Sequence, residues 1–292
     1  MNYYNEIKEQ LVNNEIIKKV KDYSKNRSDL NAYYNVGKLL SKAGKHYGEG
    51  IIKEYSKKLT EELGKGYTET NLKYFRQFYI FSNSHTVCDE LTWSHYRALL
   101  SVDDKAIDYY INLCIKNNLS VRELCKRIKN QEYERLPNET KNKLIENKEN
   151  QIIDFIKNPI IINNTDNLEI IKEKMLHKLI LEDMKNFLSE LGDGFTYVSD
   201  EYKIKIGNNY NYIDLLLYNI KYKCYVVVEL KITELKKEHI GQIETYMNYI
   251  NKNIKTINEN KTIGIIIVRK DNEFIMEYCS DKRILTREYI LN

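Results

Sequence analysis

The sequence predicts an α + α/β protein of two domains, in which an all-helical domain precedes an α/β domain of element order αβββαββ. Up to residue 136, apolar residues recur at the spacing of amphipathic helices. After residue 167, one such helix is followed by short apolar runs between turn residues, which is typical of strands. The stretch that begins at 137 is dominated by Lys, Asn and Glu. We therefore expect a helical domain at 1–136, a polar connector at 137–166 and a second domain at 167–292.

The first domain is predicted to be a succession of helices with recognisable ends. The apolar positions of its first helices are Ile16, Val20, Tyr23, Leu39, Leu40, Ile51, Ile52, Tyr55 and Leu59. Gly64 and Gly66 follow, as is typical just past a helix C-terminus. Either Thr68 or Thr70 can cap the next helix, because a threonine hydroxyl accepts from the free N–H groups of a first turn.

The last two helices of this domain, at about 106–115 and 120–129, are joined by a short turn. The second opens with the capping box Ser120–Glu123, and its basic residues are Arg122, Lys126, Arg127 and Lys129. This arrangement is compatible with a helix-turn-helix that binds DNA, and Arg97 in an earlier helix can touch a DNA phosphate. An ordinary helical hairpin with a solvated basic face explains the same pattern, so both interpretations stay open.

The second domain opens with an amphipathic helix, from about Leu168 to Leu191, that ends at Gly192-Asp193-Gly194. Three strand patterns, a helix and two further strands follow. In order, these elements are expected at 195–206, 210–218, 225–232, 236–250, 263–268 and 274–279. Gly207-Asn208-Asn209 supplies hairpin turn chemistry between the first two strands, and Val226–Val228 are typical of a strand that is buried on both faces.

Composition and charge exclude several classes of protein. The net charge is +4, with 26 basic against 21 acidic residues in 1–150, so DNA binding is permitted without being required. No apolar stretch approaches the roughly 20 residues that cross a bilayer, and the first residues lack the pattern of a signal peptide. The five cysteines form no C-x-x-C pair and are expected to be reduced thiols. We therefore expect a cytoplasmic protein that makes no membrane contact.

Two carboxylates and a lysine are the candidates for catalysis. Asp214 lies in the second expected strand, and Glu229 and Lys231 end the third, where strand alternation puts them on one side. If these strands pair, Asp214 can lie opposite Glu229, and two converging carboxylates suit Mg²⁺, with Mn²⁺ as an alternative. Such a metal lowers the pKa of a bound water and stabilises charge that develops at phosphorus. Lys231 can hold the attacking water, so the pattern predicts a metal-dependent phosphodiesterase.

Context selects this motif, because Glu-x-Lys by itself occurs seven times in the chain. Glu229 differs from the other glutamates: it ends an apolar strand, follows Asp214 by 15 residues and precedes a helix that contains Gln242. A carboxylate and a lysine at the end of a buried strand are costly unless they pair with an ion or with each other. A salt bridge between Glu229 and Lys231 is therefore an alternative that the pattern leaves open.

Several segments together resemble a known family. They are Tyr47-Gly48, Leu63–Tyr67, Asn71-Leu72, Arg76–Tyr79, Leu91–Tyr96, Ser120–Leu124 and Tyr133–Arg135 in the first domain, and Phe187–Gly192, Gly194-Phe195, Ile213–Tyr218, Val228–Lys231, Gly241-Gln242 and Ile263–Ile266 in the second. In this order, and over nearly the whole chain, they resemble the bacterial YhcG-like nucleases of the PD-(D/E)XK superfamily. The resemblance implies a helical, DNA-binding N-terminal domain followed by a restriction-endonuclease-like nuclease domain.

Carried over by position, the resemblance implies roles for individual residues. Asp214 and Glu229 would be the metal carboxylates, Lys231 the catalytic lysine, and Gln242 the glutamine that often follows in the next helix. The helix of the family usually offers a glutamate where this chain has His177. The further metal ligand is then either His177 itself or Glu173, one helical turn earlier.

The sequence therefore predicts a Mg²⁺-dependent DNA endonuclease whose N-terminal domain binds DNA. The alternative is a DNA-binding or partner-assembly protein with an inactive nuclease-like domain, which the departure at His177 motivates. DNA is the expected partner in both cases. A homodimer would bring together the two active sites that cutting both strands favours, although no residue requires one.

Overall fold

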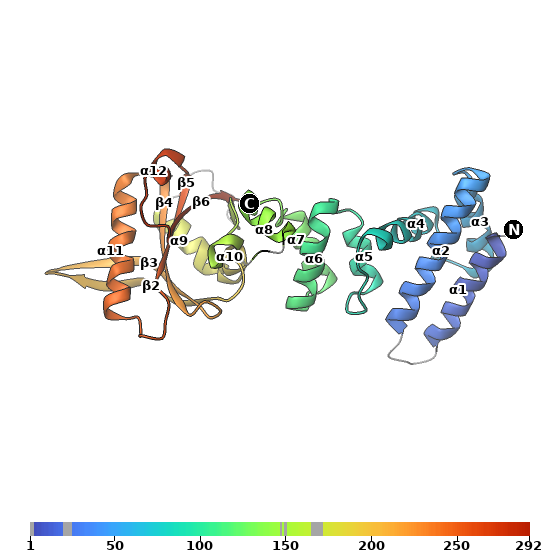
Figure 1. Ribbon diagram of the computed structural model, residues 1–292, viewed down its shortest axis with the longest axis horizontal. Helices are drawn as coiled ribbons and strands as arrows, with labels where there is room; N and C mark the ends of the chain where they lie inside the picture. The colour runs from blue at the N-terminus through green and yellow to red at the C-terminus, as the bar shows by residue number, and fades with distance from the viewer. Residues whose placement is uncertain (1–2, 20–24, 147, 149–150, 165–171) are drawn as a thin grey trace. The chain divides into compact units, whose positions relative to one another are not determined.

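A computed structural model describes residues 3–19, 25–146, 148, 151–164 and 172–292 of the chain. Within them, the chain divides into two compact units, Met1–Tyr133 and Glu134–Asn292. Figure 1 shows helices alone in the first unit and a sheet with helices in the second. The predictions made for Val20 and Tyr23, and the start of the helix expected from Leu168, lie outside the described residues. No helix in the described part of the chain is long and apolar enough to cross a membrane.

The first unit consists of seven described helices, as the sequence predicts. They are α1 (Tyr3–Lys19), α2 (Lys25–Tyr47), α3 (Ile51–Leu63), α4 (Glu69–Ser84), α5 (Trp93–Leu99), α6 (Asp104–Asn117) and α7 (Val121–Lys129). A core of buried apolar side chains joins α1 to α4 and includes Leu11, Leu40 and Leu72. Helices α2 and α4 approach so closely that a Cβ at Gly37 would lie 2.0 Å from the backbone oxygen of Phe75, which explains a glycine inside a helix.

The predicted helix ends are confirmed. Gly64 is the C-cap of α3, with a φ of 91° that favours glycine. Thr68, and not Thr70, caps α4 through its hydroxyl, which accepts from the backbone N–H of Asn71 at 3.3 Å. The capping box of α7 is also present, because the hydroxyl of Ser120 and the carboxylate of Glu123 each accept from the other's backbone N–H.

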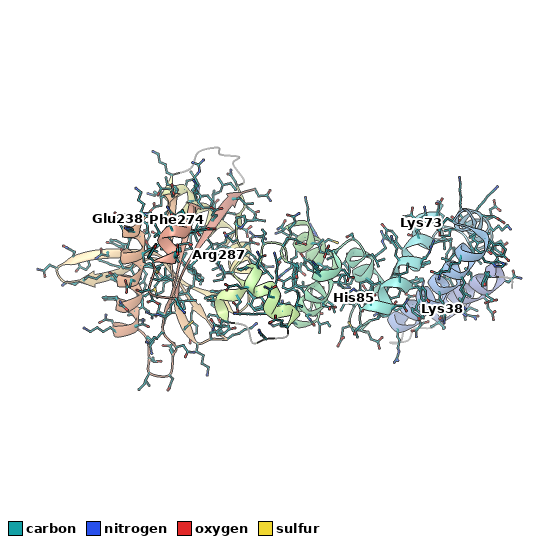
Figure 2. The ribbon with its side chains drawn as sticks, turned by 45° about the horizontal axis from the view of Figure 1, so that its top comes forward. Lys38, Lys73, His85, Glu238, Phe274 and Arg287 are labelled. Carbon is teal, nitrogen blue, oxygen red and sulfur yellow. The ribbon has the colours of Figure 1, made fainter. Side chains whose placement is uncertain are left out.

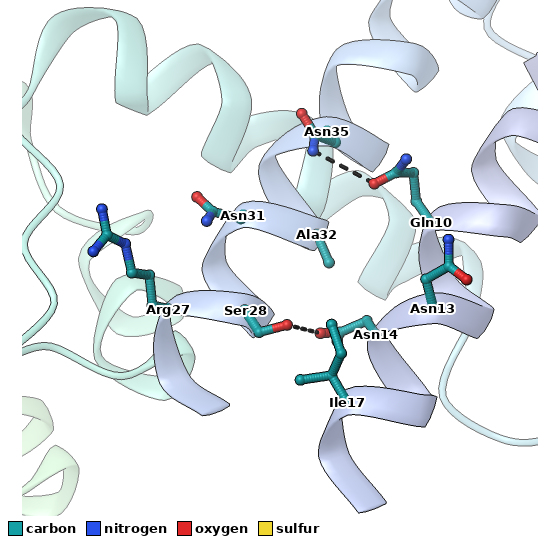
Figure 3. A pocket seen from close by; sticks show the side chains of 9 residues that line it. All are labelled: Gln10, Asn13, Asn14, Ile17, Arg27, Ser28, Asn31, Ala32 and Asn35. Atoms are coloured by element: carbon teal, nitrogen blue, oxygen red, sulfur yellow. Dashed lines mark hydrogen bonds between the residues drawn. The ribbon is translucent and has the colours of Figure 1, made fainter. Parts of the chain in front are cut away.

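Helices α1 and α2 enclose a cavity of about 390 Å³ (Figure 3). Its lining is rich in amide side chains, among them Asn14, Asn31 and Asn35. Asn14 is itself buried and bonded, donating to Asp29 at 2.7 Å and accepting from the Ser28 hydroxyl at 3.0 Å. The hydrogen bonds of this lining therefore hold α1 against α2.

The second unit combines six strands with helices. Its elements are α8 (Asn138–Ile145), the 3₁₀ helix η1 (Ile152–Phe155), β1 (Ile160–Ile162), α9 (Glu173–Glu182), α10 (Met184–Leu191), β2 (Phe195–Ile206), β3 (Asn209–Asn219), β4 (Cys224–Glu234), α11 (Lys237–Asn253), β5 (Ile263–Lys270), α12 (Glu273–Glu277) and β6 (Ile284–Leu291). The sheet order is β1-β6-β5-β4-β3-β2. Strands β2, β3 and β4 are antiparallel neighbours, whereas β4, β5, β6 and β1 run parallel. This arrangement confirms the predicted restriction-endonuclease-like αβββαββ domain.

Each face of the sheet has its own core. One face packs on α9 and α10 through residues such as Leu176, Phe187 and Val228, and the other packs on α11 through Val227 and Met247. Burial on both faces explains why β4 and β5 read as continuous apolar runs. A Cβ at Gly264 of β5 would lie 2.6 Å from the sulfur of Met247, so glycine lets α11 lie close to the sheet.

Two local predictions differ from the structure. The helix expected from 168 to 191 is interrupted at Asp183, whose side chain accepts from the backbone N–H of Asn186 and so caps α10. The strand expected at 274–279 is wrong: the segment forms the short helix α12, which Asn272 caps, and its Phe274 and Tyr278 are exposed instead of packed on a sheet. The last strand is β6.

The polar segment at 137–166 contains α8, η1 and β1, and β1 pairs with β6 at the edge of the sheet. A buried ion pair also ties its start to the second unit. Arg135 (9% exposed) binds the carboxylate of Glu190 (6% exposed), and Glu190 accepts in addition from the backbone N–H of Ile161 at 2.9 Å.

Candidate active site

The candidate site lies where β3 and β4 separate. The backbone pairing of these strands extends from Asn219 and Cys224 to Leu215 and Val228, and the next residue on each strand is a carboxylate, Asp214 or Glu229. Beyond this point, the two carboxylates connect the strands by accepting hydrogen bonds from the backbone of the opposite strand. The Asp214 carboxylate accepts from the backbone N–H of Leu230 at 2.7 Å, and the Glu229 carboxylate accepts from the backbone N–H of Asp214 at 3.4 Å.

Lys231 joins these two carboxylates. Its ammonium group lies 3.3 Å from Glu229 Oε2 and 4.0 Å from Asp214 Oδ2. Only 13% of the lysine side chain and 2% of the Glu229 side chain are exposed, against 27% for Asp214. The structure therefore brings together the three residues that the sequence singles out, with Asp214 the most accessible of them.

Electrostatics in this cluster favour a further positive charge. Burial, followed by the negative charge of Asp214, raises the pKa of Glu229 to about 8, although Lys231 opposes the shift. Burial also raises the pKa of Asp214 above its ordinary value. For Lys231, burial alone would lower the pKa, but the carboxylates around it outweigh that effect and raise it. One ammonium group thus faces two carboxyl groups, the buried Glu229 and the partly exposed Asp214, and their raised pKa values mean that a further positive charge would stabilise the ionised forms.

Helix α9 adds two side chains to the site. Glu173, in its first turn, lies 3.5 Å from the ammonium group of Lys231. His177, one turn later, donates from Nε2 to the backbone carbonyl of Asp214 at 3.1 Å. Glu173 therefore faces the charged cluster, while His177 holds the backbone of the strand that bears Asp214.

Helix α11 lies on the other face of the sheet. Gln242, half-buried in its second turn, donates from its amide to the hydroxyl of Tyr246 at 3.0 Å. His239, which sequence reasoning missed, accepts at Nδ1 from the backbone N–H of Lys236. Burial and the charges of Lys231 and Lys236 lower the pKa of His239, so its neutral form is favoured beside the site. The available signal was a histidine in the first turn of the helix that follows Glu229 and Lys231.

The donor set fits a hard divalent cation. Asp214 and Glu229 offer carboxylate oxygens, which Mg²⁺ prefers, and Mg²⁺ is commonly held by one or two carboxylates together with water and phosphate oxygens. Among the described residues, no three His, Cys, Asp or Glu side chains come together as a metal-binding group. The fit therefore rests on the Asp214–Glu229 pair and on its uncompensated negative charge.

The basic residues expected to bind DNA differ in their surroundings. Arg122, Lys126 and Lys129 are exposed on α7, and their spacing puts them on one side of the helix. Arg127 instead pairs with the buried carboxylate of Glu132 at 3.1 Å. The guanidinium of Arg97 lies over the ring of Tyr74, 5.3 Å from its centroid. The capped helical hairpin of α6 and α7 is present as predicted.

The α/β fold, with its carboxylates and lysine at the separation of two strands, defines a protein of the PD-(D/E)XK nuclease class. Residues 153–291 match the family model of the YhcG PDDEXK nuclease domain, and residues 7–135 match that of the DUF1016 N-terminal domain. Together the two matches span most of the chain and confirm the resemblance to the YhcG-like nucleases seen in the sequence.

The individual proteins and solved structures that match this chain share low sequence identity with it. The curated protein "Putative nuclease YhcG" of Escherichia coli (strain K12) is 26% identical over an alignment of 261 residues, and the match covers 76% of this chain and 70% of the relative. A repair endonuclease from Pyrococcus abyssi matches 42% of this chain at 17% identity with a TM-score of 0.31. The EndoMS–dsDNA2 complex matches 44% at 18% identity with a TM-score of 0.30. The chain covers 48% of the length of each of these two solved structures.

Proposed function

We propose that this nuclease-family chain is a metal-dependent DNA endonuclease that hydrolyses phosphodiester bonds at Asp214, Glu229 and Lys231. The proposal rests on one lysine, Lys231, whose ammonium group lies 3.3 Å from the buried Glu229 carboxylate and 4.0 Å from the partly exposed Asp214 carboxylate. A strand-end salt bridge between Glu229 and Lys231 does not account for Asp214, which brings a second negative charge against the first. Two neighbouring carboxylates are costly to the fold unless a cation compensates them, which a bound metal would do.

The residues divide the chemistry among them. Asp214 and Glu229 would hold Mg²⁺ or Mn²⁺, which supplies a more acidic bound water and stabilises charge at phosphorus. Lys231 orients the attacking water and offsets the negative charge of the phosphate. Glu173 holds the lysine from the side of α9. Gln242 would contribute an amide toward the water or the phosphate, as the resemblance implies, in place of its hydrogen bond to Tyr246.

The first unit is proposed to bind DNA. The exposed side of α7, formed by Arg122, Lys126 and Lys129, suits contact with a phosphate backbone. Arg97 lies over the ring of Tyr74 and Arg127 pairs with Glu132, so these contacts orient their guanidinium groups. Replacing the three exposed residues by Gln should weaken DNA binding, and more so at low salt.

One observation favours a second candidate, a DNA-binding or partner-assembly protein with an inactive nuclease-like domain. His177 stands where the helix of the family usually has a glutamate, and it bonds to backbone. Glu173 weakens this alternative, because it brings a carboxylate to Lys231 from the same helix.

The test is cleavage of supercoiled plasmid, linear duplex, single-stranded and four-way branched DNA with Mg²⁺, Mn²⁺ or EDTA. Metal-dependent cutting by the wild type that is lost in Asp214→Ala and Lys231→Ala supports the nuclease. Lys221→Ala is the matched control, because Lys221 forms an exposed pair with Asp193 in the same unit. DNA binding without cleavage of any substrate would instead support the second candidate.

A further inference from the structure

The β2–β3 hairpin carries a surface that the proposed chemistry does not use. Figure 1 shows this hairpin extending away from the rest of the second unit, beyond α11. Lys203 pairs with Tyr212 and Lys205 with Tyr210, so these four side chains share one face of the hairpin. All four are exposed, with Tyr210 at 56% and Tyr212 at 51%.

The opposite face of the same hairpin is already occupied. Ile204 and Ile213 are buried in the core that packs on α11. The core of the domain therefore packs on the opposite face of the hairpin and does not cover these tyrosines. Their exposure is unusual for large aromatic side chains, which stabilise a fold mainly when buried.

The exposed face is basic as well as aromatic. Residues 202–212 contain two lysines, three tyrosines and no acidic residue. The ammonium group of Lys203 lies 3.9 Å from the ring centroid of Tyr210, and that of Lys205 lies 5.9 Å from it. Positive charge is therefore concentrated beside an accessible ring, a combination that complements a nucleotide, which has an aromatic base and an anionic phosphate.

This face lies on the strand that carries Asp214 into the candidate active site. Asp214 follows Tyr212 by two residues and Tyr210 by four in β3. Because a strand rises by about 3.3 Å per residue, the two tyrosines lie at successive steps of about 7 Å along β3 from the carboxylate. Aromatic side chains on one face of a sheet stack successive unpaired bases in known single-strand binders.

We propose that this face binds unpaired nucleotides of the DNA strand that enters the active site. The bases stack on Tyr210 and Tyr212, and the phosphates contact Lys203 and Lys205. In a duplex the bases already stack on one another, so their faces are available to the tyrosines only where the strand is unpaired. The inference rests on the proposed nuclease function, because it assumes that the bound DNA strand continues to a cleavage site at Asp214.

The experiment measures binding of a fluorescent single-stranded oligonucleotide, and of its blunt duplex, to the full chain in EDTA. Tyr210→Ala/Tyr212→Ala should weaken single-strand binding by about tenfold for each base stacked, with much less effect on the duplex. Tyr210→Phe/Tyr212→Phe keeps the rings and should restore most of the affinity. Lys203→Gln/Lys205→Gln should reduce the salt dependence of binding by about 0.7 per lysine in the log–log slope.

Phe274→Ala/Tyr278→Ala is the matched control, because it removes two exposed aromatic side chains from α12 (Phe274 is labelled in Figure 2). Unchanged single-strand affinity in the tyrosine double variant, or equal losses for single strand and duplex, would overturn the inference. Failure of the nuclease proposal looks different: the hairpin variants would still lose single-strand affinity, but the wild type would cut nothing with any metal.

Discussion

Asp214 and Glu229 each accept a hydrogen bond from the backbone of the other's strand, at 2.7 and 3.4 Å. The two carboxylates replace the ladder hydrogen bonds that β3 and β4 no longer make with each other beyond Leu215 and Val228. The separation of the strands is therefore held by the same side chains that are proposed to bind the metal. Function and local stability oppose each other here, because the carboxylates also repel.

We expect Glu229→Gln to stabilise the metal-free protein while abolishing cleavage. The amide keeps the size of the side chain and removes the cost of a buried ionisable carboxyl, whose pKa burial and the charge of Asp214 raise to about 8. Calorimetry in EDTA should show a higher Tm for the variant. Added Mg²⁺ should then raise the Tm of the wild type and leave that of the variant nearly unchanged. A lower Tm in EDTA would contradict this view of the site.

Glu173 and His177 should respond differently to substitution. Glu173→Gln removes a carboxylate that lies 3.5 Å from Lys231, so we expect metal-dependent cleavage to fall by roughly tenfold or more. His177→Asn should instead mainly lower stability, since His177 bonds to the backbone of Asp214. Cleavage rates at saturating Mg²⁺, with Tm for both variants, separate these effects. If the His177 variant loses more cleavage activity than the Glu173 variant, His177 and not Glu173 takes part in the reaction.

Breaking the Arg135–Glu190 pair should destabilise the second unit strongly. Both side chains are buried, and Glu190 also holds the backbone N–H of Ile161 beside β1. Arg135→Ala leaves a buried carboxylate uncompensated, which costs about 3–5 kcal/mol. Lys58→Ala, which breaks an exposed pair with Glu54, is the control and should change the free energy of unfolding far less, because solvent screens an exposed pair. Denaturant unfolding measures both, and equal effects would refute the assignment.

Gly37→Ala should destabilise the first unit by about 1–3 kcal/mol or more, because its Cβ would meet the rigid backbone of Phe75. Gly44→Ala, in the same helix, meets nothing closer than 3.5 Å and should be neutral or stabilising by about 0.5–1 kcal/mol. Trp93 is the single tryptophan and packs on Phe75 and Phe78. Its fluorescence therefore reports unfolding of this unit, and similar midpoints for the two variants would contradict the prediction.

The first unit should lose stability as the pH rises above 6.5. Burial alone lowers the pKa of His85, but hydrogen bonds to Asp104 and Asp108 outweigh burial and raise it above 6.5. A raised histidine pKa stabilises the fold fully below the unfolded pKa, and this contribution disappears as pH rises through the folded pKa. Asp104→Asn/Asp108→Asn should therefore be less stable than the wild type at pH 5.5 and equally stable at pH 9. A constant difference across this range would exclude the His85 contribution.

Much of the fold could be predicted because its signals are local. Helical spacing, the Thr68 cap and the Ser120–Glu123 box each depend on residues within one or two turns, and all are present in the structure. The strand at 274–279 was mispredicted because its apolar residues resemble a strand, whereas the segment has no neighbouring strand to pair with and Asn272 starts a helix.

The site divides in the same way. The sequence by itself indicated that Asp214 lies in one strand and that Glu229 and Lys231 lie in the next, because the period of a strand and the residues of a turn can be recognised among adjacent residues. Only the tertiary structure decided that Glu173 reaches the lysine while His177 holds the backbone, and that His239 lies beside them. These contacts join segments tens of residues apart. Their geometry depends on how α9 and α11 pack against opposite faces of the sheet, which no local pattern specifies.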